Sequence, residues 1–335
     1  MKRCGKILYL DQFAVSNMYD ADAESHWGQL REVICQKISE GKLLCPMPLE
    51  HLYETVGRSA TDKDGVKSQQ YLESIKAQHD FFWKLARGKV FYGYEDIAAA
   101  EIIMLLKQGK VSNIKSMYIH KAYNPQIDIL DFYDEGHIIN IDLHNYNTEL
   151  FSGINQLRDI SKQSCTQYKV PKNTQNDVLV LNAIKRLQVE KYIIGLQEFL
   201  RKGYVKVRGV DCNSQQLPNK VDFLILKLSR KNITQKNVET LIRELSTRGF
   251  DRIPSMDIRS ILAADIALSD KRQTPNDEID LDRASIGLKV SDYFFADHEK
   301  KLAIEKYNLD KKFGTKVFSG KKNSVLDLVA ILKTL

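Results

Sequence analysis

The sequence predicts an α/β protein in which helices flank a parallel sheet built from the two ends of the chain, with a mainly α-helical middle. Two observations support this class. Near each end, short runs of β-forming residues are followed by an acidic or small polar residue and then by a helical pattern. The middle instead carries long amphipathic stretches with apolar residues at positions i, i+3, i+4 and i+7.

The first sixty residues predict a β-α-β-α order. KILYLD (6–11) is a short apolar run closed by an acid, as a buried parallel strand would be. A helical stretch over 24–40 ends at Gly41, and KLLCP (42–46) indicates a second short strand. Pro48 then opens a helix, PLEHLYETVGR, because proline suits the first helical turn.

The middle of the chain predicts helices with few interruptions. EGHIINIDLHNY (135–146) is an interposed strand candidate, and 210–223 is a polar connection that contains proline. From about residue 255 strands and helices alternate again, with strands expected at 292–297 and 315–319. We therefore expect residues 1–60 and 255–335 to form one core, and residues 65–250 to form a helical insertion or subdomain.

Composition excludes several classes of protein. The 335 residues are 43% apolar and 28% charged, with 17 Gly and 7 Pro, so the chain is neither disordered nor collagen-like. Its five cysteines are scattered without a C-x-x-C pair, which argues against a disulfide framework and a thiolate zinc site. Asp11 interrupts the apolar run near the N-terminus before a signal peptide could form, and no run is long enough to span a membrane. These features favour a cytoplasmic protein.

The common cofactor and nucleophile motifs are absent. The sequence has no G-x-G-x-x-G after a strand, no G-x-x-x-x-G-K-[ST], no H-E-x-x-H and no G-x-S-x-G. The pair His137 and His144 fits a strand edge better than a set of metal ligands. The chemistry must therefore come from other side chains, and carboxylates are the candidates.

Two aspartates follow predicted strands. Asp11 comes after ILYL and Asp297 after YFFA, and in an open parallel sheet the reactive crevice lies beyond the carboxyl ends of the strands. Each aspartate is equally suited to cap the following helix. Glu50 and Glu54 lie four residues apart on one helix face. A further acidic group, of which one or two members could serve a site, consists of Asp277, Glu278, Asp280 and Asp282.

These acidic segments resemble the dispersed motifs of PIN and PIN-like domains, which are metal-dependent nucleases, many of them toxin ribonucleases. The resemblance rests on YLDQF (9–13), HLYET (51–55) and the stretch DLDRAS…SDYFFADHEKKL (280–302). It implies a catalytic and metal-binding set carried over by position: Asp11, Glu54 with Glu50 as its rival, Asp280 with Asp282 as its rival, and Asp297 with Asp292.

Such a cluster of acids calls for a divalent cation. At about 4 Å and an effective dielectric constant of about 20, each pair of like charges costs about 4 kcal/mol, so the acids either take up protons or recruit an ion. Mg²⁺ or Mn²⁺ suits hard oxygen ligands and accepts phosphate oxygens from a substrate. Asp11 would be the central ligand, with Glu54 and Asp280 sharing the ion or orienting water, and Asp292 and Asp297 completing the second side.

The net charge of +7 permits a polyanionic partner. Basic residues gather in 202–209, 228–236 and 311–323, either as solvated faces or as a grip on nucleic acid. We expect a metal-dependent nuclease that acts on RNA rather than DNA, and the resemblance alone suggests a toxin or phage-defence effector with a regulatory protein partner. The alternative is an inactive PIN-like scaffold that binds nucleic acid or protein. The oligomeric state stays open.

Overall fold

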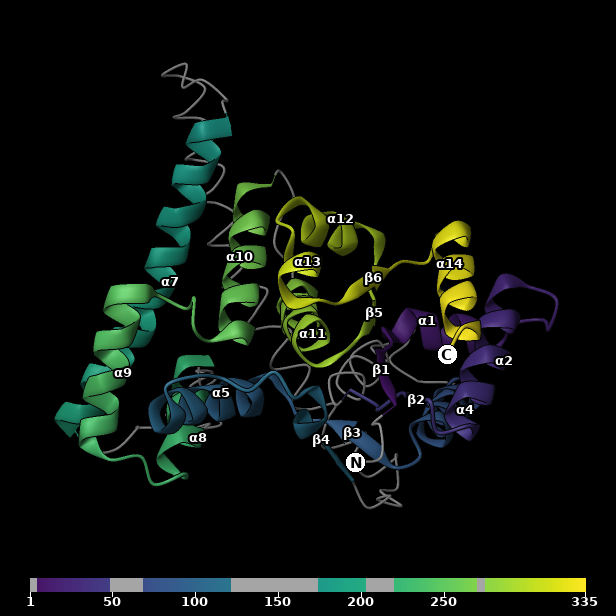
Figure 1. The fold of residues 1–335 in the computed structure, drawn as a ribbon, viewed down its shortest axis with the longest axis horizontal. Coiled ribbons are helices and arrows are strands. Elements are labelled where there is room, and N and C mark those ends of the chain that lie inside the picture. The colour runs from purple at the N-terminus through teal and green to yellow at the C-terminus, as the bar shows by residue number, and fades with distance from the viewer. Residues whose placement is uncertain (1–4, 49–68, 122–173, 203–219, 270–274) are drawn as a thin grey trace. The chain divides into compact units, whose positions relative to one another are not determined.

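The structure is a computed structural model that describes residues 5–48, 69–121, 174–202, 220–269 and 275–335 (Figure 1). These residues divide into two compact units. The first unit consists of the described parts of Met1–Gly93, Ile114–Asn140 and Ile286–Leu335. The second consists of those of Tyr94–Asn113 and Ile141–Ser285.

A four-stranded sheet forms the centre of the first unit. Its strands lie in the order β2-β1-β5-β6, and every neighbouring pair is parallel. Their bounds are β1 Lys6–Tyr9, β2 Leu43–Leu44, β5 Tyr293–Phe295 and β6 Lys316–Phe318. Two strands come from each end of the sequence, so the expected parallel sheet is confirmed. Continuous apolar strands such as YFF in β5, buried throughout, are typical of a sheet covered on both faces.

The first unit also contains helices that follow or precede each strand. These are α1 Gln12–Tyr19, α2 His26–Ser39, α4 Gln69–Ala86, the 3₁₀ turn η1 Lys115–Tyr118, α12 His298–Lys306, α13 Leu309–Phe313 and α14 Lys322–Lys333. Ser25 caps α2 by accepting a hydrogen bond from the backbone N–H of Gly28 at 3.0 Å. Gly28 must be glycine, because a Cβ there would lie 2.0 Å from the carbonyl oxygen of Asp22. α1 is the helix for which Asp11 was considered as a cap.

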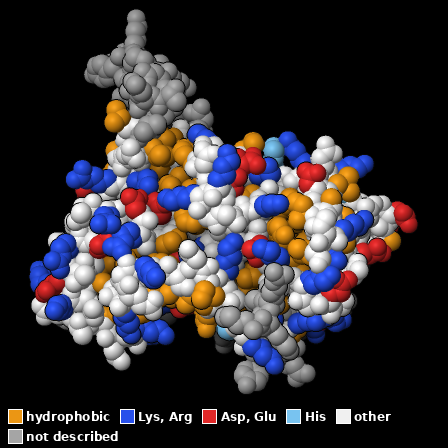
Figure 2. All heavy atoms as spheres, in the orientation of Figure 1, with side chains coloured by type: hydrophobic (Ala, Val, Ile, Leu, Met, Phe, Trp, Pro, Cys, Tyr) orange, Lys and Arg blue, Asp and Glu red, His pale blue; other side chains and the backbone are white. Residues whose placement is uncertain are grey.

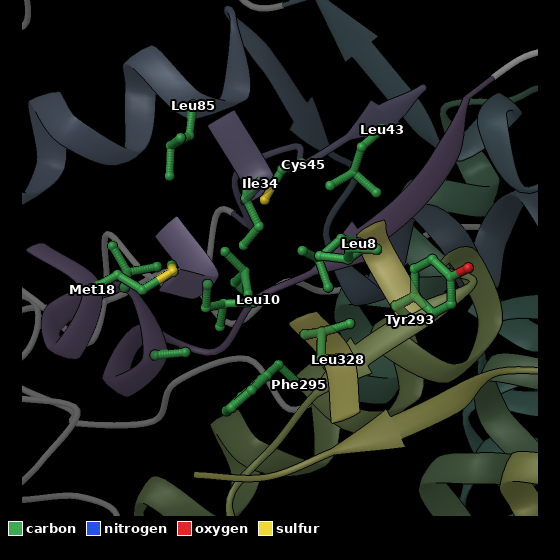
Figure 3. Packing of buried hydrophobic residues seen from close by; sticks show 14 of the residues in the cluster. Leu8, Leu10, Met18, Ile34, Leu43, Cys45, Leu85, Tyr293, Phe295 and Leu328 are labelled. Carbon is green, nitrogen blue, oxygen red and sulfur yellow. The ribbon is translucent and has the colours of Figure 1, made fainter. Parts of the chain in front are cut away.

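The core of this unit lies between the sheet and the pair formed by α2 and α14, which pack against each other. Figure 3 shows Leu8 of β1, and Leu10 just after it, among buried side chains that include Ile34 of α2 and Leu328 of α14. Each of these four side chains is fully buried. Burying one such side chain contributes about 1.5–3 kcal/mol, so this layer fixes the strand that leads to Asp11.

An antiparallel ribbon of two short strands also belongs to the first unit. It pairs β3 Lys89–Phe91 with β4 Ile119–Lys121, and an isolated bridge joins Val90 to Met47, three residues after β2. We predicted only helices for this stretch of the chain. Three-residue strands carry too little periodicity to be separated from the flanking helical patterns.

The second unit is helical, as predicted for the middle of the chain. Its elements are α5 Tyr94–Gln108, α7 Thr174–Lys202, α8 Lys220–Ser229, α9 Gln235–Arg248, α10 Pro254–Leu268 and the first part of α11 Pro275–Val290. Thr234 and Asn237 form a reciprocal capping box at the start of α9. Buried Glu101 accepts hydrogen bonds from the backbone N–H and hydroxyl of Ser255 at 2.9 and 2.7 Å, which fastens α5 to the first turn of α10.

The boundaries of the two units differ from the expected domain boundaries. Residues 69–93 and 114–121 group with the sheet, whereas residues 255–285 group with the helices. The predicted strand at 135–146 and nearly all of the predicted helix at 48–58 lie outside the described residues. Within the described parts of the chain, no helix is long and apolar enough to cross a membrane.

Candidate functional site at the carboxyl ends of β1 and β5

The sheet has a topological switch point between β1 and β5. From β1 the chain passes through α1 and α2 to β2 on one side, and from β5 it passes through α12 and α13 to β6 on the other. Since these two connections leave in opposite directions, a crevice is expected beyond the carboxyl ends of β1 and β5, where ligands of open α/β sheets bind.

Asp11 and Asp297 lie at this point of the fold. Tyr9 pairs with Phe294, so the same register continued for two residues sets Asp11 opposite Ala296, next to Asp297. Neighbouring strands are about 4.8 Å apart. Both aspartates are half-buried. Two of the predicted site residues thus follow neighbouring parallel strands, although their segments are almost 300 residues apart in sequence.

Each of these aspartates also begins a helix. Asp297 is the N-cap of α12, and its Oδ1 accepts a hydrogen bond from the backbone N–H of Lys300 at 2.7 Å. Asp11 is the N-cap of α1, where its backbone carbonyl accepts from Ala14 and Val15 while its side chain makes no capping bond. Capping and ligation are compatible for Asp297, because a carboxylate has two oxygens with about four lone-pair sites.

An aromatic cluster supports the segment that follows Asp11. Phe13 lies 5.6 Å from Phe295 and 6.2 Å from Trp27 between ring centroids. Gly320, just beyond β6, approaches the same ring so closely that a Cβ would lie 2.8 Å from Phe13 Cε2. The start of α1 is therefore held by packing on both sides, which limits the freedom of the Asp11 backbone.

Asp292 lies at the other end of β5. It precedes the strand, and its Oδ2 accepts a hydrogen bond from the backbone N–H of Ile7 at 2.9 Å. Because a strand rises about 3.3 Å per residue, Asp292 is about 16 Å from Asp297 along the chain. The two residues therefore lie at opposite ends of β5, and Asp292 does not complete the second side of the site beside Asp297.

Asp292 instead belongs to a clamp at the amino ends of the strands. Its Oδ1 lies 3.2 Å from Lys6 Nζ and 3.7 Å from Lys115 Nζ. Lys115 also donates to the carbonyl oxygen of Ser291. Burial lowers the pKa of Lys115, and the charge of Asp292 acts in the opposite direction. The sequence carries no signal for this contact, because Lys115 lies 177 residues before Asp292.

Asp280 and Asp282 lie in the part of α11 that belongs to the second unit. Asp280 is in the second turn of the helix, not at its opening, and lies 3.7 Å from an Arg283 nitrogen. Asp282 accepts a hydrogen bond from Arg259 Nε at 2.8 Å, and Glu278 pairs with the same guanidinium. The charge of Asp282 is thus already balanced within the helical unit.

The remaining candidates lie outside the described residues, namely Glu50, Glu54, His137 and His144. Among the residues that are described, no group of three or more His, Cys, Asp or Glu side chains is placed to hold a metal ion. The donors at the switch point are two carboxylates, which are the hard oxygen ligands that Mg²⁺ and Mn²⁺ prefer. Asp11 and Asp297 are therefore of the right chemical type to supply two ligands of such an ion.

His298 is a further polar residue of this region, and it is not among the residues predicted for the site. It is the first residue of α12, directly after Asp297, and within the described part of the chain its buried Nδ1 has no hydrogen-bond partner. The signal that could have identified it is its position in ADHEK, immediately after a strand-end aspartate.

Comparison with protein-family models, with curated proteins and with solved structures finds no match to this chain. The geometry at the ends of β1 and β5 and the resemblance of the acidic motifs are therefore the features that indicate a function.

Proposed function

We propose that this protein is a nuclease with a PIN-like core that uses Mg²⁺ or Mn²⁺ to cleave phosphodiester bonds, with RNA preferred to DNA. One observation carries the proposal. Asp11 and Asp297 follow two neighbouring parallel strands at the switch point of the sheet, where open α/β sheets bind their ligands. Carboxylates that meet in such a site repel each other, and a divalent cation is the ligand that would relieve this repulsion.

The chain's own residues would act as ligands and as positioning groups. Asp11 would be the central ligand, as the resemblance to PIN-like domains implies. Asp297 would bind through the oxygen that does not cap α12, and Glu54 is the candidate third ligand by resemblance. A bound divalent ion supplies a Lewis acid for the phosphodiester and lowers the pKa of a coordinated water.

Lysines near the switch point support a polyanionic substrate. The pairing of Phe295 with Phe318 sets Asp297 beside Gly320, and the exposed Lys321 and Lys322 follow directly. On the face drawn in Figure 2, Lys and Arg side chains occur singly or in small groups instead of forming one continuous band. Exposed lysines such as Lys321 and Lys322 can make local contacts to phosphates.

The test is a comparison of wild type, Asp11→Asn and Asp20→Asn with single-stranded RNA and DNA in the presence of Mn²⁺. Asp20 is exposed at the other end of α1, so its variant carries the same chemical change away from the site. We expect Asp11→Asn to slow RNA cleavage about a hundred-fold or more, the scale on which removing one positioned reactive group acts. Asp20→Asn should cleave like wild type. Equal cleavage by all three proteins, each shown to be folded by circular dichroism, would refute the proposal.

One alternative is a PIN-like scaffold that binds nucleic acid without cleaving it. It is favoured by the capping bond of Asp297, because this bond gives the carboxylate a structural role that needs no metal ion. The same experiment separates the two functions. A scaffold would bind RNA with a salt-dependent affinity that Mn²⁺ leaves unchanged, and no cleavage would be seen with any of the three proteins.

A toxin or defence role with a regulatory partner is part of the proposal by resemblance only. Its test is inducible expression in a bacterial host. Growth arrest with wild type and normal growth with Asp11→Asn at equal protein levels would support that role, and equal growth would count against it.

A further inference from the structure

The ribbon of β3 and β4 is firmly attached to the unit that carries Asp11. Phe91 of β3 stacks on Tyr9 of β1 with ring centroids 5.2 Å apart, and both side chains are fully buried. Val90 is also buried and is joined to Met47 by the isolated bridge. The ribbon is therefore a fixed part of the sheet unit, although it has no role in the site described above.

A stacked pair of aromatic rings, of which Tyr92 is exposed and His120 partly buried, lies on one face of this ribbon. The ring of Tyr92 stacks on the imidazole of His120 with centroids 4.4 Å apart and planes 29° from parallel. Tyr92 keeps 39% of its surface exposed, and its backbone N–H donates to the carbonyl oxygen of Tyr118 at 3.0 Å. Two rings held in this way form a platform on which a planar base can stack, and such stacking does not require a particular base.

Two lysines face each other at the end of the same ribbon. Lys89 pairs directly with Lys121 across the two strands. Like charges at directly opposed positions destabilise a sheet, and in the described part of the chain neither lysine forms an ion pair with a carboxylate. A bound phosphate would relieve this repulsion. The ribbon therefore carries both an aromatic platform and an unneutralised cationic pair.

The two features occupy opposite faces of the ribbon. Side chains alternate along a strand, so Lys89 and Lys121 lie on one face, and Tyr92 with His120 lies on the other. β4 is the outer strand of this ribbon among the described residues. A nucleotide extends its base and its phosphates to different sides of the sugar. A single strand that crosses the outer edge of β4 can therefore stack a base on one face and place phosphates near the lysines of the other.

We propose that the β3–β4 ribbon is a binding surface for single-stranded nucleic acid, with Tyr92 and His120 as the stacking platform and Lys89 and Lys121 as the phosphate contacts. A base paired in a duplex has both faces covered by its neighbours, so the platform selects single strands. As a surface that holds the substrate for cleavage, the ribbon depends on the proposed function, whereas its binding of nucleic acid does not.

The experiment measures binding without cleavage. The full-length chain with Asp11→Asn is titrated, in a buffer that contains EDTA, into a fluorescently labelled single-stranded RNA, the DNA of the same sequence, and the matching RNA duplex. Adding Tyr92→Ala should raise the dissociation constant for both single strands about five-fold or more, while Tyr92→Phe should keep the affinity because it keeps a ring. The duplex should bind more weakly than either single strand and should respond little to Tyr92→Ala. Tighter binding of RNA than of DNA would identify RNA as the source of the strand.

The lysines are tested through the salt dependence of binding. Lys89→Ala with Lys121→Ala should reduce the slope of log affinity against log salt by about 1.4, because each phosphate contact to a single strand contributes about 0.7. Lys110→Ala with Lys333→Ala is the matched control, since both residues are exposed and the loss of charge is the same.

If Tyr92→Ala binds both single strands as tightly as the protein with Tyr92 intact, the inference is overturned. Weaker binding by the lysine variant alone would not rescue it, because any polyanion attracted by positive charge would give that result. Equal slopes for the two double-lysine variants would also overturn it. If wild type cleaves nothing with Mn²⁺ and yet the ribbon variants lose single-strand affinity as described, the proposed function fails and the ribbon's role stands.

Discussion

At the scale of single residues, Asp292 illustrates how a carboxylate of an acidic motif can join the amino ends of neighbouring strands. It accepts the backbone N–H of Ile7 and balances the charges of Lys6 and Lys115, all at the amino ends of the strands. Its neighbour in the motif, Asp297, lies at the opposite ends of the same strands, at the switch point. Two aspartates five residues apart therefore have different predicted roles.

We expect Asp292→Ala to lower the free energy of unfolding by about 1–3 kcal/mol, because it leaves the partly buried N–H of Ile7 without its acceptor and Lys115 without its counter-charge. Urea denaturation measures this loss. Cleavage per folded molecule should remain at the wild-type level, in contrast to Asp11→Asn. A stable Asp292→Ala protein that has lost cleavage would instead place Asp292 in the active site.

At the scale of secondary-structure elements, the sheet was predictable where strands are apolar and end at polar residues. The four parallel strands all fall within segments of β-forming residues, and the adjacency of β1 and β5 means that Asp11 and Asp297 follow neighbouring strands. The ribbon was not predictable, because β3 and β4 have three residues each and their pairing depends on a partner 30 residues away. Neither was the placement of Asp280, because the sequence does not show which unit each turn of α11 joins.

One close contact between elements sets the distance between α11 and β5. Gly287 of α11 faces the ring of Phe294, and a Cβ at this position would lie 2.5 Å from Phe294 Cδ2. That ring is buried and packs edge-on against Tyr9, with centroids 5.3 Å apart, so it has little room to move. The helix can lie this close to the strand only with glycine at position 287.

Gly287→Ala should therefore destabilise the protein even though alanine is the better helix former. Overpacking a core costs about 1–3 kcal/mol, against about 1 kcal/mol gained in helix propensity. Thermal or urea unfolding measures the net change. The control is the double variant Gly287→Ala with Phe294→Leu, because a smaller side chain at position 294 leaves room for the alanine. The double variant should therefore lose less free energy of unfolding than the sum of the two single variants. Additive effects of the two changes would show that this contact is not the cause.

At the scale of the whole molecule, a net charge of +7 without a continuous basic band on the face drawn in Figure 2 makes binding of a polyanion depend on where individual lysines lie. Lys321 and Lys322 are the clearest case. They stand at the N-cap and first turn of α14, where positive charge is unfavourable because the helix dipole is also positive there, and the first turn contains no acidic residue. A bound phosphate would reverse that unfavourable arrangement.

Removing the charges of Lys321 and Lys322 should affect RNA binding and protein stability in different ways. Lys321→Ala with Lys322→Ala should reduce the salt slope of single-stranded RNA binding by about 1.4 and weaken binding at low salt, because two phosphate contacts are lost. The free energy of unfolding should stay the same or rise slightly, since positive charge has been removed from a helix N-terminus. Lys110→Ala with Lys333→Ala, which removes the same charge elsewhere, should leave the slope unchanged. If both double variants reduce the slope equally, the molecule attracts RNA only through its net charge, and the crevice at the switch point holds no phosphate.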